Sequence, residues 1–402
     1  MKTTVCVVGG GPAGLMLGLL LARQGVGVVV LEKHQDFLRD FRGDTVHPST
    51  LTVLDELGLG AAVQQLPGRA ANGLQATFDD GCYAVADFRR LRGRHRYLLF
   101  LPQWDLLDLL ADAAAQWPGF TLLRSTEVVG LIRDDAGRVT GVQARGPDGE
   151  VRIEAELTVA CDGRTSTVRT ALGLRPIEHA APMDVLWFRV PRPAQHQPEL
   201  LEVRAGAGGL MLLIDRGDYL QCAYVVAKGG YDAVRANGLP ALRAQVLRLS
   251  PQLENEVKAI ESWDDVKLLT VQVNRLKRWF APGVLLIGDA AHAMSPVGGV
   301  GINLAVQDAV ATARLLGPKL RAGTLSESDL ARLARRRWLP TVLTQGAQRL
   351  AQAGLVMPTL AAGARDQPVR APRVLHLLRR FPVFQAIPAY FIGRGVRPEH
   401  VE

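Results

Sequence analysis

A cluster of glycines near the start of the chain decides what this part of it can fold into. Residues 9–12 (Gly-Gly-Gly-Pro) interrupt an uncharged and largely apolar run that extends over residues 3–22. A secretory signal needs an unbroken apolar core, and a spanning helix needs roughly 20 apolar residues without central helix breakers. Export and membrane insertion are therefore disfavoured, and the run divides into separate elements.

The elements on either side of the glycines form a strand–helix–strand pattern. Residues 5–8 are short and β-branched, as in a buried strand, and residues 13–24 are rich in Leu and Ala, as in a buried helix. Gly25 ends that helix, and residues 26–31 predict a second strand. The pattern predicts a βαβ unit.

The glycine spacing in this unit is typical of dinucleotide binding. Gly9 permits a tight turn, Gly11 lets the backbone approach a pyrophosphate, and Gly14 lets helix and strand pack closely. The N-terminus of the helix then faces the phosphates. Glu32 ends the second strand, where a carboxylate can accept hydrogen bonds from ribose hydroxyls. The turn suits FAD and NAD equally well.

Composition narrows the class of protein. The chain has 402 residues and a net charge of +8, with 48% hydrophobic and 21% charged residues, which is ordinary for a globular protein. Its arginines are scattered, so no nucleic-acid partner is expected. The eight histidines and four cysteines show no metal-ligand spacing, so no metal site is expected. The isolated cysteines suggest reduced thiols and a cytoplasmic location.

Two further segments carry weaker signals. Residues 37–59 contain Arg42 in a loop, followed by a helix that is expected to begin near Pro48 and stop at Gly58. Residues 158–169 read as a strand ending at Asp162-Gly163, followed by a polar turn and a helix start. Each pattern on its own is also common in ordinary loops and turns.

The strongest later signal lies in residues 283–317. A buried strand at 284–287 ends at Gly288-Asp289, where a ligand of an α/β sheet binds, so Asp289 is placed to contact a sugar alcohol. A glycine-rich loop over residues 296–301 then leads into a helix from about Asn303, and its N–H groups would face a planar ring. A hydrolytic triad in this loop is disfavoured, because the chain has no GxSxG elbow.

Together these segments resemble, in order and spacing, the flavoprotein aromatic hydroxylases. This single-component group includes para-hydroxybenzoate hydroxylase and the ubiquinone-biosynthesis and polyketide-tailoring hydroxylases. The resemblance extends from residue 1 to about 345, and residues 387–401 also look like the tails of some bacterial members.

The resemblance implies a monooxygenase that uses FAD, with NADPH or NADH and O₂ as co-substrates. The substrate would be an aromatic small molecule (phenolic, polyketide or quinone precursor), hydroxylated through a flavin C4a-hydroperoxide. No catalytic side chain is assigned; His47 and Arg204 are too weakly supported as general bases. The implied cofactor contacts are Gly9, Gly11, Pro12, Ala13, Gly14, Glu32, Lys33, Arg42, Gln103, Asp162, Gly163, Gly288, Asp289, Pro296, Gly299, Gly301, Ile302 and Asn303.

The implied fold is α/β with an α+β insert. A Rossmann-like FAD-binding βαβ domain (1–78, 101–175 and 266–345) would be interrupted by a discontinuous antiparallel-sheet substrate domain (79–100 and 176–265), with C-terminal helices over 346–402. Alternating patterns predict strands at 183–190, 200–205, 209–215 and 219–227. Trp187, Met211, Tyr219 and Tyr224 on these strands are the candidate substrate contacts.

Some alternatives stay open at this stage. A flavin-dependent halogenase would carry a WxWxIP segment and a disulfide reductase a CxxxxC pair, and the sequence has neither. A geranylgeranyl-reductase-like enzyme and a non-catalytic flavin-binding module remain as alternative functions. Either a monomer or a homodimer is compatible with the sequence. Residues 370–381 form a basic amphipathic pattern that can lie on a membrane, although a helix packed on the protein body is favoured.

Overall fold

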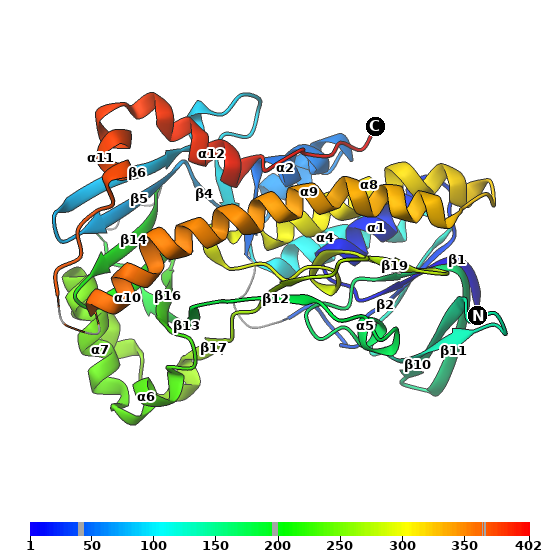
Figure 1. Cartoon of the computed structure of the whole chain (residues 1–402), viewed down its shortest axis with the longest axis horizontal. Coiled ribbons are helices and arrows are strands. Elements are labelled where there is room, and N and C mark those ends of the chain that lie inside the picture. Colours follow the sequence, from blue (N-terminus) through cyan, green and yellow to red (C-terminus); the bar gives the residue numbers. More distant parts are fainter. Residues whose placement is uncertain (39–43, 195–199, 364, 366) are drawn as a thin grey trace.

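The computed structural model describes residues 1–38, 44–194, 200–363, 365 and 367–402. Arg42 lies outside the described residues. Two sheets dominate the molecule, one beneath the long helices and the other beside the C-terminal helices (Figure 1). Within the described ranges, every helix is too short or too polar to cross a membrane.

The first sheet is built around five parallel strands. They lie in the order β20 (Val284–Leu286), β11 (Gly149–Ala160), β1 (Lys2–Val8), β2 (Val28–Leu31) and β8 (Phe120–Leu123). The antiparallel strands β19 (Phe280–Ala281), β10 (Val139–Gly146) and β9 (Glu127–Arg133) extend it. All carboxyl ends of the parallel strands therefore meet at one edge, where ligands of such sheets bind.

Helix α1 (Pro12–Arg23) connects β1 and β2 and is buried along most of its length. It packs against α4 (Gln103–Ala115) and α8 (Gly301–Arg321), and α8 in turn packs against α9 (Glu327–Ala351). The predicted strand–helix–strand unit is confirmed. Its lack of charge follows from burial on every side, because a helix inside a protein has no solvent face.

The second sheet has seven strands. Their order is β17 (Lys267–Leu269), β13 (Met183–Pro191), β16 (Tyr219–Ala227), β15 (Gly209–Asp215), β14 (Leu200–Gly206), β5 (Gly73–Phe78) and β6 (Gly81–Asp87). The predicted antiparallel strands are confirmed, and only β14 and β5 pair in parallel among these described strands. Strand β5 thus belongs to this sheet, although its residues fall in the segment 1–78 that was expected to bind the cofactor.

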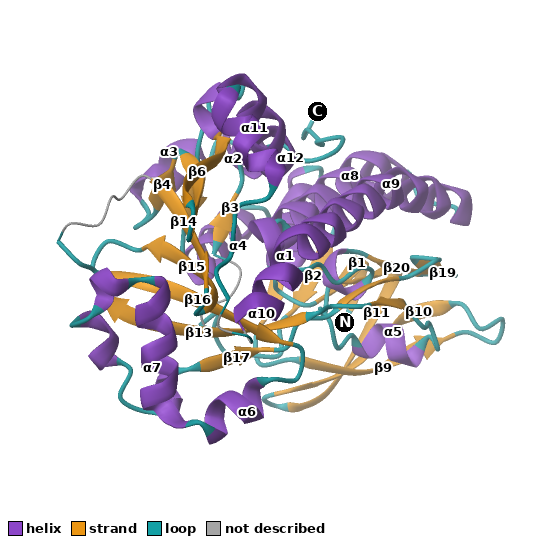
Figure 2. Ribbon diagram, turned by 60° about the vertical axis from the view of Figure 1, so that its left-hand side comes forward, coloured by secondary structure: helices purple, strands orange, loops and turns teal. Residues whose placement is uncertain are grey.

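Smaller elements fill the space between and around the two sheets (Figure 2). Two short sheets join β3 (Thr45–Val46), β7 (Leu98–Phe100) and β4 (Arg69–Ala71), and β12 (Ile177–His179) with β18 (Val273–Arg275). The remaining α-helices among the described residues are α2 (Pro48–Glu56), α3 (Gly60–Gln65), α5 (Thr167–Ala171), α6 (Tyr231–Ala236), α7 (Gly238–Leu249), α10 (Met357–Gly363), α11 (Arg373–Arg380) and α12 (Ala386–Gly393).

The C-terminal segment connects the two halves of the molecule. Helices α11 and α12 pack against β6 of the second sheet. The chain then returns to the first half, where the backbone N–H of Val401 donates to Glu56 of α2 at 2.8 Å. Figure 1 shows this red segment crossing from α11 to the neighbourhood of α8 and α9.

Candidate cofactor site

The glycine turn after β1 is shaped by close backbone contacts. A Cβ on Gly14 would lie 1.9 Å from the carbonyl oxygen of Gly9. A Cβ on Gly9, which has a φ of +103°, would lie 2.5 Å from the carbonyl oxygen of Cys161. In contrast, a Cβ on Gly11 would meet no atom within 4 Å. Gly9 and Gly14 are thus required by the fold, whereas Gly11 borders open space at the start of α1.

Glu32 reaches back to the glycine turn from the end of β2. Its Oε2 accepts the backbone N–H of Gly10 and its Oε1 accepts that of His34, each at 3.0 Å. The side chain is 8% exposed, whereas the neighbouring Lys33 is exposed to solvent. The carboxylate is therefore held at a fixed place beside the first strand–helix turn.

The end of β11 brings Asp162 and Gly163 to the same edge. The Oδ2 atom of Asp162 accepts the backbone N–H of Val168 at 3.1 Å, whereas its Oδ1 is buried and has no partner within the described part of the chain. Burial raises the pKa of Asp162 above its ordinary value. A buried acceptor without a partner is costly, so this atom is suited to a ligand donor.

The end of β20 adds Gly288 and Asp289. A Cβ on Gly288 would lie 3.5 Å from that of Ala13, which places this strand end against the start of α1. The carboxylate of Asp289 accepts a hydrogen bond from Arg164 Nε at 3.1 Å. Arg169 donates to the carbonyl oxygen of Ala290 at 3.0 Å.

These two arginines connect the loops that follow β11 and β20. Arg169 also donates to the carbonyl oxygen of Arg164, so one buried guanidinium fixes both loops. The sequence pattern does not single out either arginine, although both lie in residues 158–169. The sequence signal for these two arginines is their position next to the Asp162-Gly163 turn. Nothing in the sequence connects Arg164 to its partner Asp289.

The loop over residues 296–301 is held by His47. Its Nε2 lies 2.9 Å from the carbonyl oxygen of Gly299 and its Nδ1 lies 2.7 Å from that of Ile392 in α12. Burial lowers the pKa of His47 below its ordinary value, although the two carbonyl contacts act in the opposite direction. A Cβ on Gly299 would lie 3.1 Å from Thr45. His47 thus connects the glycine loop to the C-terminal helix, a structural position and not that of a general base.

Two of the expected cofactor contacts, Asn303 and Gln103, also make polar contacts within the protein. Asn303 Oδ1 accepts hydrogen bonds from the hydroxyls of Ser49 and Thr50, both at 2.7 Å.

Gln103 begins α4, and its backbone N–H bonds to the Asp44 carboxylate. Asp44 also pairs with Arg216. Burial raises the pKa of Asp44, and Arg216 only partly counteracts this effect. Pro296, Gly301 and Ile302 lie in the loop and first turn of α8.

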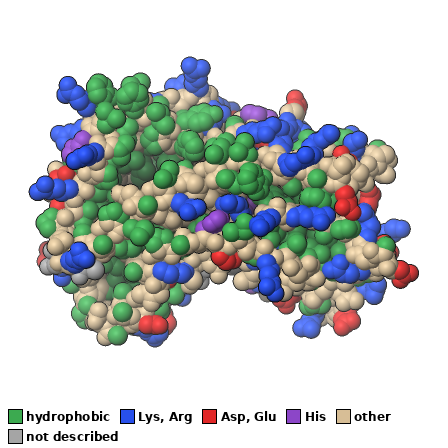
Figure 3. All heavy atoms as spheres, viewed as in Figure 1, with side chains coloured by type: hydrophobic (Ala, Val, Ile, Leu, Met, Phe, Trp, Pro, Cys, Tyr) green, Lys and Arg blue, Asp and Glu red, His purple; other side chains and the backbone are tan. Residues whose placement is uncertain are grey.

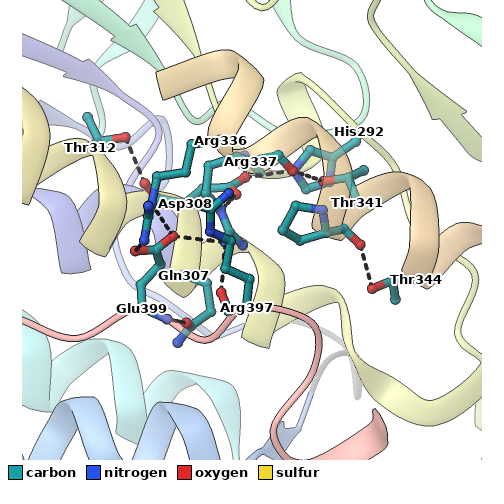
Figure 4. Close-up of polar contacts among 12 residues, drawn as sticks. His292, Gln307, Asp308, Thr312, Arg336, Arg337, Thr341, Thr344, Arg397 and Glu399 are labelled. Atoms are coloured by element: carbon teal, nitrogen blue, oxygen red, sulfur yellow. Dashed lines mark hydrogen bonds and ion pairs between the residues drawn. The ribbon is translucent and has the colours of Figure 1, made fainter. Parts of the chain in front are cut away.

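A buried charge network, whose side chains are drawn in Figure 4, contacts the backbone just after β20. Asp308 in α8 accepts the backbone N–H of Gly288 at 3.1 Å, the Nε2–H of His292 at 2.6 Å and the Nε–H of Arg337 at 2.8 Å. Burial alone would raise the pKa of Asp308, but His292 and Arg337 together hold it below its ordinary value. The Nε2 atom of His292 is thus occupied by Asp308, in agreement with the expectation that a hydrolytic triad is disfavoured.

The same network holds the C-terminal tail. The buried carboxylate of Glu399 accepts hydrogen bonds from Arg314 at 2.7 Å and Arg336 at 2.7 and 2.8 Å. Arg337 Nη1 lies 3.4 Å from it. The Glu399 backbone N–H donates to Gln307. Arg337 is therefore shared between the tail and the carboxylate that positions Gly288.

The second sheet presents one of its faces to this site. Trp187, Leu212 and Val203 are half-buried on that face and belong to one apolar cluster with Val297 of the glycine loop. Tyr219 lies at the end of the same face, where Arg189 stacks on its ring at 4.6 Å. Trp187 and Tyr219 are therefore on the side of the sheet that faces the cofactor loops.

Met211 and Tyr224 point to the opposite face. Met211 pairs across the strands with Tyr224, and both pack in the cluster that contains Leu242 and Val246 of α7. The Tyr224 hydroxyl donates to the carbonyl oxygen of Gly208 at 2.8 Å. Their expected role as substrate contacts is corrected, because alternate residues of a strand point to opposite faces.

This difference between the faces gives a testable prediction. We expect Tyr224→Phe to lower the free energy of unfolding by about 1 kcal/mol through the lost hydrogen bond, with an unchanged KM for substrate. Trp187→Leu, on the other face, should raise KM. Urea unfolding and steady-state kinetics on both variants check this. A larger change of KM in Tyr224→Phe than in Trp187→Leu would contradict the assignment.

The residues at the carboxyl edge fit the FAD that the resemblance implies. The open space beside Gly11, the free N-terminus of α1 and the partnerless Asp162 Oδ1 suit a pyrophosphate and its hydroxyl-bearing neighbours. A Cβ on Gly163 or Gly301 would also meet no atom within 4 Å. Fold and site together define a flavin-dependent oxidoreductase with one dinucleotide-binding turn.

Comparison with known proteins identifies the family. Residues 2–338 match the model of the FAD binding domain family, so the chain belongs to this family of FAD-dependent monooxygenases. It is an enzyme of the aromatic hydroxylase group, with FAD as cofactor and NAD(P)H and O₂ as co-substrates.

Curated relatives and solved structures agree with this assignment. The chain is 34% identical over 388 residues (96% of the chain, 91% of the relative) to 6-methylpretetramide 4-monooxygenase of Streptomyces rimosus. It is 29% identical to protoasukamycin 4-monooxygenase of Streptomyces nodosus subsp. asukaensis, covering 80% and 81% of the two chains. These relatives are monooxygenases, so the double-bond reductase alternative is not favoured.

The fold is shared with flavoproteins of known structure. OxyS anhydrotetracycline hydroxylase from Streptomyces rimosus superposes with a TM-score of 0.75 at 26% identity, covering 98% of this chain and 76% of that one. A mutant of P. aeruginosa PqsL with four substitutions gives a TM-score of 0.79 at 24% identity, covering 91% of this chain and 100% of that one.

Proposed function

We propose that the chain hydroxylates an aromatic polyketide, using FAD, NAD(P)H and O₂. The observation that carries the proposal is the 34% identity over 96% of the chain to an enzyme named for 6-methylpretetramide. The half-buried apolar face around Trp187, Val203 and Leu212 supports it, because a planar polycyclic substrate needs apolar contact on its faces.

The residues of the carboxyl edge then have distinct binding roles. Gly11 and the N-terminus of α1 would hold the pyrophosphate, Glu32 the adenosine ribose and Asp289 the ribityl chain. Pro12, Ala13, Lys33, Arg42, Gln103, Gly163, Gly288 and residues 296–303 would complete the cofactor contacts. FAD held by these residues would supply the redox chemistry between NAD(P)H and O₂.

The protein's own contribution is to bind, orient and exclude water. His47 holds the 296–301 loop in place, and Asp308 holds Gly288. The apolar face of the second sheet keeps water from the reacting centre, which limits unproductive loss of activated oxygen. Within this scheme no side chain is assigned as a general base. We place the enzyme in the cytoplasm on the grounds of its four free cysteines, and its sequence is compatible with a monomer or a homodimer.

A substrate screen tests the proposal. The FAD-loaded protein is mixed with NADPH or NADH and with polycyclic polyketides, simple phenols and quinone precursors. Polycyclic substrates should speed NAD(P)H oxidation most and give a product that carries one oxygen atom from labelled O₂. A reduced product formed without O₂ uptake, or faster turnover with simple phenols, would contradict the proposal.

A further inference from the structure

The C-terminal segment exposes an unusual amount of apolar side chain. Eight large apolar or aromatic residues within 374–391 are between 41% and 62% exposed: Val374, Leu377, Phe381, Val383, Phe384, Ile387, Tyr390 and Phe391. We call them the C-terminal apolar surface. Figure 3 shows hydrophobic side chains gathered over α11 and α12 with basic groups around them. Contiguous apolar patches of this kind mark interaction sites on soluble proteins.

The C-terminal apolar surface is carried by elements that are anchored in the fold. Leu375 and Leu378 of α11 are buried in the cluster on the second sheet, and Ala389 of α12 is fully buried beside Phe88. The Gln385 side chain donates to the carbonyl oxygen of Leu378 at 3.2 Å. The inward side chains of these helices are packed against the protein. The exposed apolar side chains therefore belong to helices that are fixed in place, and not to a loose tail.

The charged side chains of the segment itself are all basic. Residues 367–398 contain six arginines (370, 373, 379, 380, 394 and 397) and no acidic residue. The carboxylates of Asp79 and Asp80 accept the backbone N–H groups of Val369 and Ala371 at the base of the segment, and Asp80 also lies 3.8 Å from His376 Nε2 on α11. Arg373 and Arg380 are exposed on α11, spaced so as to lie on the same face as Val374 and Leu377.

The combination of apolar side chains and positive charge selects the partner. A second copy of this chain would bring two arginine-rich surfaces of equal sign together, which is unfavourable without acidic counterparts. An anionic lipid surface offers both negative headgroups for the arginines and an acyl boundary for the apolar side chains. Basic helices with aromatic and aliphatic residues on the same segment are typical of binding in the interface of a bilayer.

We propose that the C-terminal apolar surface docks the enzyme on the face of an anionic bilayer. Val383, Phe384 and Ile387 would enter the headgroup boundary, while Arg373 and Arg380 pair with lipid phosphates. This docking is peripheral, and it places one edge of the molecule, formed by α11 and α12, against the lipid (Figure 1). It does not depend on which aromatic substrate the enzyme takes.

Vesicle co-sedimentation of the FAD-loaded full chain tests the proposal. The probes are vesicles of phosphatidylcholine alone and of phosphatidylcholine mixed with phosphatidylglycerol. We expect binding to the mixed vesicles only, and a steep loss of binding near 1 M salt, where the screening length is about 3 Å. Equal binding to both vesicle types, or none to either, would overturn the proposal.

Two surface variants separate the apolar and the charged contributions. Phe384→Ser/Ile387→Ser should lower the partition coefficient at least about tenfold through lost apolar burial. Arg373→Gln/Arg380→Gln should lower it about tenfold to thirtyfold. Visible absorbance of the bound flavin and thermal unfolding should match the unchanged enzyme, since all four side chains are exposed.

Matched variants elsewhere on the surface serve as controls. Val129→Ser removes an apolar side chain on β9 that is 48% exposed. Arg145→Gln/Arg175→Gln removes two positive charges from exposed positions that are distant in sequence from the C-terminal segment. Both controls should bind vesicles like the unchanged enzyme. If Arg145→Gln/Arg175→Gln loses binding as much as Arg373→Gln/Arg380→Gln, net charge explains the effect. If the C-terminal variants abolish self-association or capture of an acidic protein and leave vesicle binding intact, the surface serves a protein partner. Either result rejects the proposal.

Discussion

Gly11→Ala is expected to fold normally and to bind FAD at least about a hundredfold more weakly, a loss of roughly 2.7 kcal/mol. Gly11 has a φ of −77°, which an alanine adopts without strain, and a methyl group there would meet no protein atom within 4 Å. The space beside it is where the pyrophosphate would approach α1, so the methyl group would displace the ligand and leave the protein unaffected.

Flavin fluorescence titration of the apoprotein measures this change, and thermal unfolding of the apoprotein shows that the fold persists. Gly346→Ala in α9 is the matched control, because its methyl group also meets no atom within 4 Å and lies outside the proposed site. Gly14→Ala should instead destabilise the apoprotein, since its Cβ would lie 1.9 Å from Gly9 O. FAD affinity unchanged in Gly11→Ala would show that the pyrophosphate binds elsewhere.

Arg337→Met is expected to lower the free energy of unfolding by about 3–5 kcal/mol, the usual result of removing one partner of a buried ion pair. The side chain of Arg337 is 1% exposed and that of Asp308 is fully buried, so water cannot replace the lost guanidinium. Urea unfolding measures the change. Exposed Arg335, two residues earlier on α9, gives the control Arg335→Met, which should change stability by no more than about 0.5 kcal/mol.

A double variant shows whether the loss comes from the uncompensated charge. Asp308→Asn/Arg337→Met leaves no unpaired carboxylate at position 308, so it should be less destabilised than the sum of the two single changes. A loss below about 1 kcal/mol in Arg337→Met would mean that His292 alone satisfies Asp308.

The same pair predicts how stability responds to acid. The folded-state pKa of Asp308 is below the ordinary value of 3.8, so its stabilising contribution is present above pH 3.8. It is lost as the pH falls through the folded-state pKa, because the unfolded chain then binds the proton more readily. The unchanged enzyme should therefore lose stability below pH 3.8 more steeply than Asp308→Asn.

Local patterns were enough to predict the strand–helix–strand unit, the antiparallel strands of the second sheet and the strands that end near Asp162 and Asp289. In each case the signal lies within a few residues, as glycine spacing or alternation. The sequence could not show which face of β15 and β16 turns toward the cofactor. Alternation assigns residues to two faces, but when both faces are apolar it does not indicate which one lines the site. Met211 and Tyr224 were misplaced for this reason.

The buried charge network could not be predicted either. His292, Asp308, Arg337 and Glu399 lie on separate elements, and each looks like an ordinary polar residue in its own segment. Their contact arises only when α8, α9 and the tail pack together. Arg164 shows the same limit, since its partner Asp289 follows 125 positions later in the sequence.

The strand order of the first sheet has a consequence for synthesis on the ribosome. Strand β1 emerges among the first residues, yet its neighbour β11 and the next strand β20 are translated much later, β20 only at residues 284–286. At about 5–20 residues per second, the nascent chain waits some tens of seconds before that sheet can close. During this interval the apolar β1–α1 segment lacks its partners α4 and α8, so chaperone supply and growth temperature should strongly affect the yield of intact protein.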